Sequence, residues 1–416
     1  MVQIIPPPAE QDDQLALYQP YFRRTREIGE SYGLCFLDIY WRKATRDNLS
    51  FVASFGLPNR FSHWYFGGLY KQLKIQQDEN LLTILELVLN TDPVYAFLLD
   101  SNSFLENLMV IAHVMGHVDF FKNNAWYTRS DRNQLNKCEL HARCIRELAD
   151  AHGRQKVDEM IEASLTITHT INVFERDPKK KSARLIYFLR DQVRSQITKT
   201  RKSDPRLLDF KLAYQILSMM IQEMEYFDLI GRTQIINEGW ASFIEFKILE
   251  KILKPNDWLN FTLQFSKRPA PYLIGFTLLN SIFRKGGWPE VLEIRRVYED
   301  IAFVDRFLDQ KLCEELDLFV VDKESNERDP SVKKVKEKII EEKETRGQPQ
   351  VLVKDFDGKT GALVLENPDK ERTLDRKRTE LFLKRFAILW PFEISLVDGE
   401  NCFRLRSGNV SIEKVA

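Results

Sequence analysis

Cysteines are few in this sequence and follow no pattern. The chain has five, an odd number, and no two of them form a C-x-x-C pair. A disulfide framework usually shows an even set of cysteines in a short secreted chain, and a zinc ribbon shows closely spaced pairs. We therefore predict free thiols in a reducing compartment.

An excess of charge and long apolar runs are also missing. Acidic and basic residues number 61 each, so no overall charge draws the chain to nucleic acid or to an anionic membrane. No run of about 18 apolar residues predicts a membrane-spanning helix. The N-terminal residues do not pair a basic region with an apolar stretch, as a secretory signal does. We expect a cytoplasmic protein that binds no nucleic acid.

Several common catalytic motifs are absent as well. The sequence holds no G-x-x-x-x-G-K-[ST] phosphate loop, no G-x-G-x-x-G dinucleotide motif and no serine in a nucleophile elbow. These absences leave P-loop, dinucleotide-binding and common serine hydrolase functions without support.

The periodicity of apolar residues predicts a mainly α protein. Helical spacing dominates as far as about residue 320, and 44% of the residues are apolar, which is ordinary for a globular chain of this length. We predict a helical core domain, gluzincin-like or bundle-type, over residues 1–322. A polar linker follows at 323–330. Turn signals and alternating apolar residues then predict a small α+β domain over 331–416.

A basic segment interrupts the core domain at about 177–206. It carries ten lysines and arginines. Such a segment docks an acidic partner or RNA in some proteins, and in others it is a solvated insertion between two core helices. We favour the insertion, because the aromatic residues that accompany nucleic-acid binding are scarce in it.

Two histidines one helical turn apart are the most informative feature. His113 and His117 leave the same face of a predicted helix, and the residues around them are apolar. Two imidazoles placed in this way can bind one metal ion. The alternative is a buried pair held by carboxylates. Metallopeptidases with this spacing read H-E-x-x-H, with the glutamate as general base, but here that position is Val114.

A glutamate in a later apolar helix completes a metal site. Glu238 has apolar neighbours, and a glutamate is rarely buried without a partner. That partner is a metal or an arginine such as Arg232. With His113 and His117 it would form a His2Glu set for a divalent metal, with zinc favoured and iron possible. Glu245, two turns further on, is a candidate for the outer shell of the site.

Other polar residues in apolar surroundings are candidates for catalysis. Glu86 lies in an apolar run predicted as a helix, and Glu223 precedes Tyr226 in another helix. Either could act as the base that Val114 does not supply. His63, set among aromatic residues, is a candidate oxyanion donor. The Glu-x-x-His repeat of di-iron bundles is absent, so no di-iron site is specified.

Five stretches resemble the stage V sporulation protein R (SpoVR) family. The run from Gly56 to Gly67 is similar to the family's G-[ML]-P-x-x-[FY]-x-H-W-x-F-G, and 86–93 is similar to its E-[LI]-V-[IL]-N-[ST]-[DN]-P. Residues 113–124 resemble H-V-x-G-H-x-D-F-F-K-N-N. Residues 223–241 resemble E-x-x-Y-F…T-x-I-x-N-E-G-W-A, and 271–276 also fit.

This resemblance implies a cytoplasmic bacterial or archaeal protein with a role in spore cortex formation. The family also occurs where no spores form, which implies stress or developmental signalling. It further implies two partners, a PrkA-type serine protein kinase and a von Willebrand A-like protein. Val114 matches the family's apolar residue, whereas Gln222 stands where many relatives carry a second acid before the tyrosine.

Two functions are consistent with these patterns. The first is a metal-dependent hydrolase that acts on peptidoglycan-related amide or peptide bonds. Its ligands would be His113, His117 and Glu238, with Glu223, Glu86 and His63 as the catalytic candidates. The second is a regulatory scaffold without enzymatic activity, which binds a serine protein kinase or a cell-wall enzyme.

Overall fold

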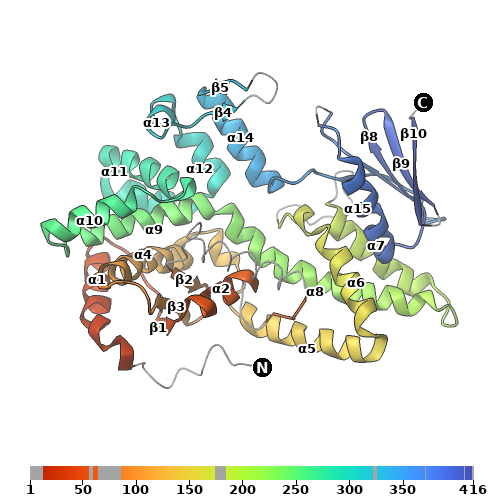
Figure 1. Cartoon of the computed structure of the whole chain (residues 1–416), viewed down its shortest axis with the longest axis horizontal. Helices are drawn as coiled ribbons and strands as arrows, with labels where there is room; N and C mark the ends of the chain where they lie inside the picture. Colours follow the sequence, from red (N-terminus) through yellow and green to blue (C-terminus); the bar gives the residue numbers. More distant parts are fainter. Residues whose placement is uncertain are drawn as a thin grey trace. The chain divides into compact units, whose positions relative to one another are not determined.

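The computed structural model describes residues 13–55, 60–63, 86–173, 184–321, 326–370, 372–406 and 408–414. Its contacts divide the chain into two compact units. The first unit combines Met1–Glu139 with Leu229–Ile340, and the second combines Leu140–Asp228 with Glu341–Ala416. Figure 1 labels most of the helices and strands of both units. The unit boundaries fall inside three helices, namely α5, α8 and α14.

The first unit is mainly helical. Its elements, with those that cross into the second unit, are η1 (Asp13–Tyr18), α1 (Gln19–Ser31), β1 (Ile39–Ala44), α2 (Arg46–Phe55), β2 (Glu86–Leu89), β3 (Val94–Leu99), α4 (Phe104–Asn123), η2 (Tyr127–Arg129), α5 (Gln134–His152), α9 (Gln234–Leu249), α10 (Pro255–Phe265), α11 (Ala270–Val297), α12 (Asp300–Phe307), α13 (Gln310–Glu315), β4 (Val320–Val321), β5 (Arg328–Asp329) and α14 (Val332–Thr345).

The second unit combines helices with a sheet. Its remaining elements are α6 (Arg154–Leu165), η3 (Thr168–Thr170), α7 (Leu185–Lys199), α8 (Arg206–Arg232), β6 (Leu352–Phe356), β7 (Leu363–Glu366), α15 (Arg376–Leu389), β8 (Ile394–Asp398), β9 (Asn401–Arg406) and β10 (Asn409–Lys414).

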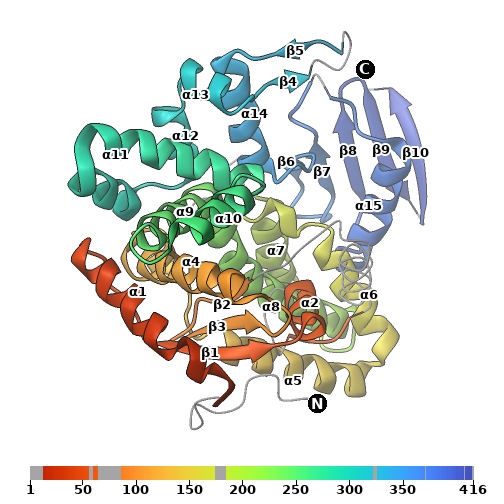
Figure 2. The same ribbon diagram turned by 60° about the vertical axis from the view of Figure 1, so that its left-hand side comes forward.

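Helix α4 forms the centre of the first unit. Ser103 and Glu106 begin it with a reciprocal capping box, in which each side chain accepts a hydrogen bond from the other's backbone N–H. Every residue from Asn107 to Phe121 is buried, because α4 has the small sheet on one side and α9 on the other. Helix α11 packs on the far side of α9 (Figure 2). A helix that is apolar on all faces needs such complete cover.

Two glycines allow these helices to approach closely. A Cβ added to Gly116 would lie 2.5 Å from the Cα of Ala241, so α4 and α9 touch backbone to backbone there. A Cβ on Gly239 would lie 2.3 Å from the Cα of Gly275, which joins α9 to α11 in the same way. Both glycines lie within one turn of a predicted metal ligand.

The local predictions around the small sheet were partly wrong. Its strand order is β1-β3-β2, with β1 parallel and β2 antiparallel to β3. The apolar run that ends at Leu89 was predicted as a helix, but residues 86–89 form β2. Asp92-Pro93 predicts the start of a helix that runs to Leu99, but residues 94–99 form β3, and the apolar run from Leu49 to Phe55 predicts a strand but lies in α2. Short apolar runs fit either structure, and pairing between strands decided the two runs that became β2 and β3.

The sheet of the second unit confirms the predicted α+β character of the C-terminal residues. Its strand order is β10-β9-β8-β7-β6, with only the β7–β8 pair parallel. The hairpins predicted around Asp357-Gly358 and Asp398-Gly399 are the β6–β7 and β8–β9 pairs. Helix α15 buries Leu383 and Phe386 and lies against β8, β9 and α6.

The two compact units divide the chain at different residues from the predicted domains 1–322 and 331–416. The predicted domains concern independent folding, and they stay a prediction. Within the predicted linker 323–330, residues Arg328–Asp329 form β5 and pair with β4. Of the predicted basic insertion 177–206, the residues before 184 lie outside the described chain. The part that follows is not simply solvated, because α7 buries its apolar residues from Leu185 to Leu189.

The mainly helical fold class is thus confirmed, with a sheet-containing C-terminal region. In the described part of the chain, none of the helices combines the length and apolar character needed to cross a membrane.

Candidate metal centre

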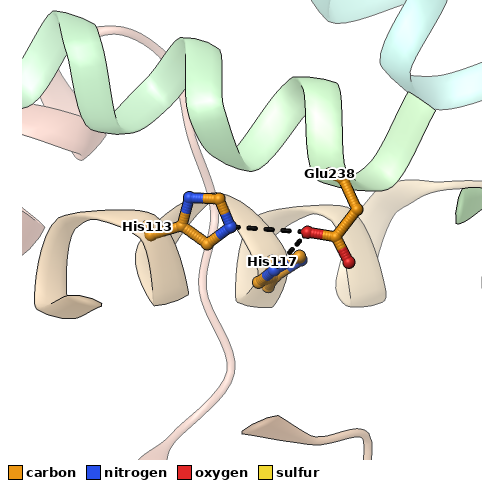
Figure 3. Close-up of side chains that lie close together, drawn as sticks. All are labelled: His113, His117 and Glu238. Carbon is orange, nitrogen blue, oxygen red and sulfur yellow. Dashed lines mark ion pairs between the residues drawn. The ribbon is translucent and has the colours of Figure 1, made fainter. Parts of the chain in front are cut away.

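Three predicted ligands meet between α4 and α9. His113 and His117 project from one face of α4, and Glu238 reaches toward both of them from α9 (Figure 3). Oxygen Oε2 of Glu238 lies 3.5 Å from Nε2 of His113 and 3.4 Å from Nε2 of His117. Among the described residues, this is the one group of three or more histidine, cysteine or acidic side chains whose donor atoms all lie within 4.8 Å of one another.

These distances fit the ligands of one ion better than direct hydrogen bonds. An N–H donor normally approaches oxygen to within about 2.7–3.2 Å, which is shorter than either contact. Zinc binds nitrogen and oxygen at about 2.0–2.2 Å, so two ligands of a tetrahedral zinc lie about 3.4 Å apart. Both contacts to Glu238 match that edge. The donor set therefore fits a small divalent cation.

The other nitrogen of each imidazole is held by a neighbouring side chain. Nδ1 of His113 lies 2.8 Å from Oε2 of Glu245, and Nδ1 of His117 lies 3.0 Å from Oδ1 of Asn237. Both partners are acceptors, so each Nδ1 carries a proton, and each Nε2, when it is not itself protonated, presents its lone pair toward Glu238. This arrangement is typical of metal-binding histidines, whose second nitrogen donates to a carboxylate or an amide oxygen.

Arg268 neutralises the carboxylate behind His113. Its guanidinium lies 2.6 Å from Oε2 of the fully buried Glu245 and donates to the hydroxyl of Ser242 at 2.9 Å. It also approaches Nδ1 of His113 at 3.1 Å. We assign the Nδ1 proton to the bond with Glu245, because a carboxylate can only accept and the contact at 2.8 Å is shorter. Arg268 then stabilises the anion that orients His113.

The site is buried on the histidine side and partly open on the carboxylate side. The side chains of His113 and His117 are 2% and 4% exposed, whereas that of Glu238 is 19% exposed. Burial by itself raises the pKa of Glu238, but His117 and His113, when they are protonated, outweigh it and hold that pKa well below its usual value. The ligand is therefore an anion, as metal binding requires.

Two buried aspartates fix the helices that carry the ligands. Asp300 accepts hydrogen bonds from the backbone N–H groups of Ile235 and Ile236, at the first turn of α9. Asp119 on α4 accepts from Nε1 of Trp240 on α9 at 3.0 Å. Its charge is balanced by Arg295, 3.1 Å away. Burial still raises the pKa of Asp119 to about 6, against the lowering effect of Arg295. These bonds set the height and rotation of Glu238 relative to the histidines.

Comparison with known proteins identifies the family. The model of the family described as SpoVR like protein matches residues 12–204 and 200–348, which include all three ligands. The chain belongs to the SpoVR-like family. It is also 22% identical over 431 residues to the "Uncharacterized protein YcgB" of Escherichia coli (strain K12), a match that covers 83% of this chain and 84% of that protein. No solved structure matches it.

The other predicted site residues of this SpoVR-like chain lie outside α4 and α9. Glu223 belongs to the second unit, where it is fully buried and lies 3.0 Å from Nδ1 of His141. Glu86 is the first residue of β2. His63 is buried, with 4% exposure, in the short described stretch 60–63. Their catalytic roles stay predictions.

Some of the residues that contact the candidate ligands could be predicted from the sequence, and others could not. Glu245 was predicted from its spacing to Glu238, and its contact with His113 agrees with that role. Asn237 was missed although it adjoins Glu238, because adjacent helical residues point in different directions. No sequence signal pointed to Arg268 or to Tyr272, whose ring stacks on His113 with 5.8 Å between centroids.

Replacing the carboxylate that orients His113 is expected to weaken metal binding. Glu245→Gln keeps the shape of the side chain but removes the charge that pairs with Arg268 and fixes the Nδ1 proton. We expect the dissociation constant for zinc to rise about 10- to 100-fold, as is usual for such outer partners. Competition with a chromophoric chelator measures it. Glu250→Gln, at the exposed end of the same helix, is the control and should bind zinc like the wild type.

Proposed function

We propose that the protein is a metal-dependent hydrolase that binds one divalent ion through His113, His117 and Glu238. One observation supports the metal above all. Both Nε2 atoms face a single carboxylate oxygen at 3.4–3.5 Å while both Nδ1 atoms meet acceptors. Without an ion, either two buried lone pairs would face an anion or both imidazoles would have to take up a second proton, and a bound cation removes the need for either.

Zinc is the favoured ion and iron is the alternative. Two histidines and a glutamate are the ligands of zinc peptidases, which keep a further position open. The same three ligands also form the facial triad of non-haem iron(II) proteins. Structural zinc sites, which leave no coordination position open, usually contain cysteine ligands, and this group of ligands contains none.

Hydrolysis is the reaction that this centre supports best. A bound zinc ion lowers the pKa of its water to about 7 and polarises a carbonyl. The partly exposed Glu238 marks the side from which a substrate could approach. Peptidoglycan-related amide or peptide bonds are the proposed substrates. Glu223 or Glu86 is the proposed base and His63 the proposed oxyanion donor.

The residue after the first histidine sets this protein apart from H-E-x-x-H peptidases. Val114 is fully buried and belongs to the main apolar cluster of the first unit. Val114→Glu would therefore bury a carboxylate among apolar side chains rather than place a base beside the ion. We expect it to lower the free energy of unfolding by about 3 kcal/mol or more and to create no peptidase activity. Urea unfolding and hydrolysis of a fluorogenic peptide test this. A folded variant that gains activity would contradict the packing of α4.

The buried Val114 also favours a second candidate function. Without a base next to the first histidine, the three polar side chains serve as a structural network or a relic site in a regulatory scaffold without enzymatic activity. That protein would act in spore cortex formation or in stress and developmental signalling. It would bind a PrkA-type serine protein kinase, a von Willebrand A-like protein or a cell-wall enzyme.

Metal analysis and hydrolysis together separate the candidates. Protein purified without added metal is expected to contain about one zinc or iron per chain by mass spectrometry of the elements. A chelator should remove the ion, and zinc should restore it. Hydrolysis of muropeptides only by the reloaded protein supports the enzyme. A loaded but inactive protein supports the regulatory role, and protein that takes up no metal contradicts the hydrolase and supports the scaffold.

A further inference from the structure

A pocket lies where α7 is joined to α8, and all of it belongs to the second unit. Its volume is about 700 Å³, which is within the usual range for ligand-binding sites. The last turn of α7, the connecting residues 200–205 and the first turns of α8 form its walls. The lining side chains on which its chemistry depends are Thr200, Lys202, Ser203, Leu207, Leu208 and Lys211.

Two cations of the pocket are available to a ligand. Lys202 and Lys211 are exposed, and neither ammonium group forms an ion pair or a hydrogen bond with any described residue. The acidic residue of the lining is Asp204, which Arg206 already neutralises. Oδ1 of Asp204 accepts from Nε of Arg206 at 3.2 Å, and Oδ2 accepts from Nη2 at 2.8 Å. The lining residues therefore offer two free positive charges and no free carboxylate.

Two hydroxyl groups add hydrogen-bond donors beside these cations. The side chains of Thr200 and Ser203 form no hydrogen bond with another described residue, so both hydroxyls can donate to a ligand. A carboxylate can only accept, and it forms its strongest hydrogen bonds with charged donors such as an ammonium group. The polar part of the pocket thus suits a carboxylate or a similar anion.

The apolar part of the pocket favours a protein segment as the source of that anion. Leu208 is 55% exposed in the wall, and its apolar neighbours there are Ile197, Pro205 and Leu207. An apolar recess takes up one inserted side chain, whereas contact with a membrane needs an apolar face that enters the lipid. RNA binds through bases that stack on aromatic rings, and the lining has no aromatic residue.

Further basic residues extend the positive surface beyond the walls of the pocket. Arg194, Lys199 and Arg201 are exposed, and none of their side chains pairs with a described residue. Over residues 194–211 the sequence has six basic residues and two acidic ones, and both acids are already paired with a basic residue. A positive surface of this extent attracts an extended acidic segment more than a small molecule.

We infer that this pocket docks an acidic segment of a partner protein, in which one apolar side chain lies between aspartates or glutamates. Carboxylates of the segment pair with Lys202 and Lys211 and accept from the hydroxyls of Thr200 and Ser203. The apolar side chain between them packs against Leu208. The surrounding basic residues raise the rate of association. The site does not depend on the metal centre, since none of its residues is a metal ligand.

Fluorescence polarisation of the full chain with three matched peptides tests the inference. The labelled probe has one leucine between two runs of four glutamates. In the second peptide glutamines replace the glutamates, and in the third serine replaces the leucine. We expect the probe to bind with a dissociation constant of about 10–100 µM. Each of the other two should bind at least about tenfold more weakly, because it lacks either the charges or the apolar side chain that the pocket accommodates.

Variants assign the binding to the pocket. Lys202→Glu/Lys211→Glu reverses two exposed charges and should weaken probe binding about tenfold or more. Leu208→Ser removes apolar contact but no charge and should weaken binding about three- to tenfold. Lys254→Glu/Lys267→Glu makes the same change of charge at exposed positions of the first unit. That variant is the control and should bind the probe like the wild type.

Several results would overturn the inference. They include equal binding of the three peptides, probe binding that neither pocket variant weakens, and no binding at about 1 mM probe. Sedimentation that shows self-association lost in Lys202→Glu/Lys211→Glu would also overturn it, by assigning the pocket to a second copy of the chain. Tighter binding of an oligouridine or of phosphatidylglycerol vesicles than of the probe would do so as well, by assigning the surface to RNA or to a membrane.

Discussion

The double variant His113→Ala/His117→Ala is expected to purify with almost no bound zinc or iron, whereas the wild type is expected to purify with about one ion per chain. The change removes two of the three donor atoms that meet at Glu238. The loss of affinity should exceed the roughly 100-fold effect of an outer partner such as Glu245. Elemental mass spectrometry and chelator competition measure both quantities.

Two further variants keep that experiment decisive if the double variant folds poorly. Glu238→Gln keeps the shape of a partly exposed side chain and should also lose the ion, because an amide is a poor ligand beside two imidazoles. His141→Gln changes another buried histidine, which pairs with Glu223 in the second unit, and should keep the metal content of the wild type. Full metal content in both the double variant and Glu238→Gln would rule out this centre.

Adding one methyl group at either helix contact is expected to lower the free energy of unfolding strongly. An alanine Cβ at Gly239 would lie 2.3 Å from the Cα of Gly275, and one at Gly116 would lie 2.5 Å from the Cα of Ala241. Backbone atoms cannot rotate away as a side chain does, so the helices must separate. We expect each variant to lose about 3 kcal/mol of unfolding free energy, at the upper end of the range for over-packing. Urea unfolding followed by tryptophan fluorescence measures the loss.

In their folded state these variants should also bind metal more weakly, which a protein that is only destabilised would not do. Gly116 lies between the two histidines, and separating α4 from α9 moves Glu238 away from both. We expect zinc affinity to fall in the folded Gly116→Ala variant. Gly231→Ala is the matched control, because no described heavy atom lies within 4 Å of the added Cβ. That variant lies in a helix and should be neutral or slightly stabilising. A wild-type stability for Gly239→Ala would contradict the close approach of α9 and α11.

The grouping of the three candidate ligands could be predicted from the sequence because local rules suffice for it. Two histidines four residues apart share a helix face in any structure that keeps the helix. Glu238 stood out because a glutamate among apolar residues needs a partner. Glu245 followed from the same periodicity. None of these steps required knowledge of which helices touch.

The residues around the ligands could not be predicted in this way. Arg268 lies in the loop before α11 and reaches Glu245 only because α11 packs on α9. The pairing of Glu223 with His141 joins positions 82 residues apart on α5 and α8. The run at Glu86 failed for a related reason, since its four residues became a strand through pairing with β3.

The sequence by itself determined the helical class, the hairpins of the C-terminal region, the family and the three candidate ligands, because each depends on periodicity or on residues close together in the chain. Only the tertiary structure decided the small sheet, the division of the chain into units, the tautomers of the two histidines and the partners of Glu223 and Glu245. Those features arise from contacts between distant segments, and the free energy of such contacts is not encoded in any local pattern.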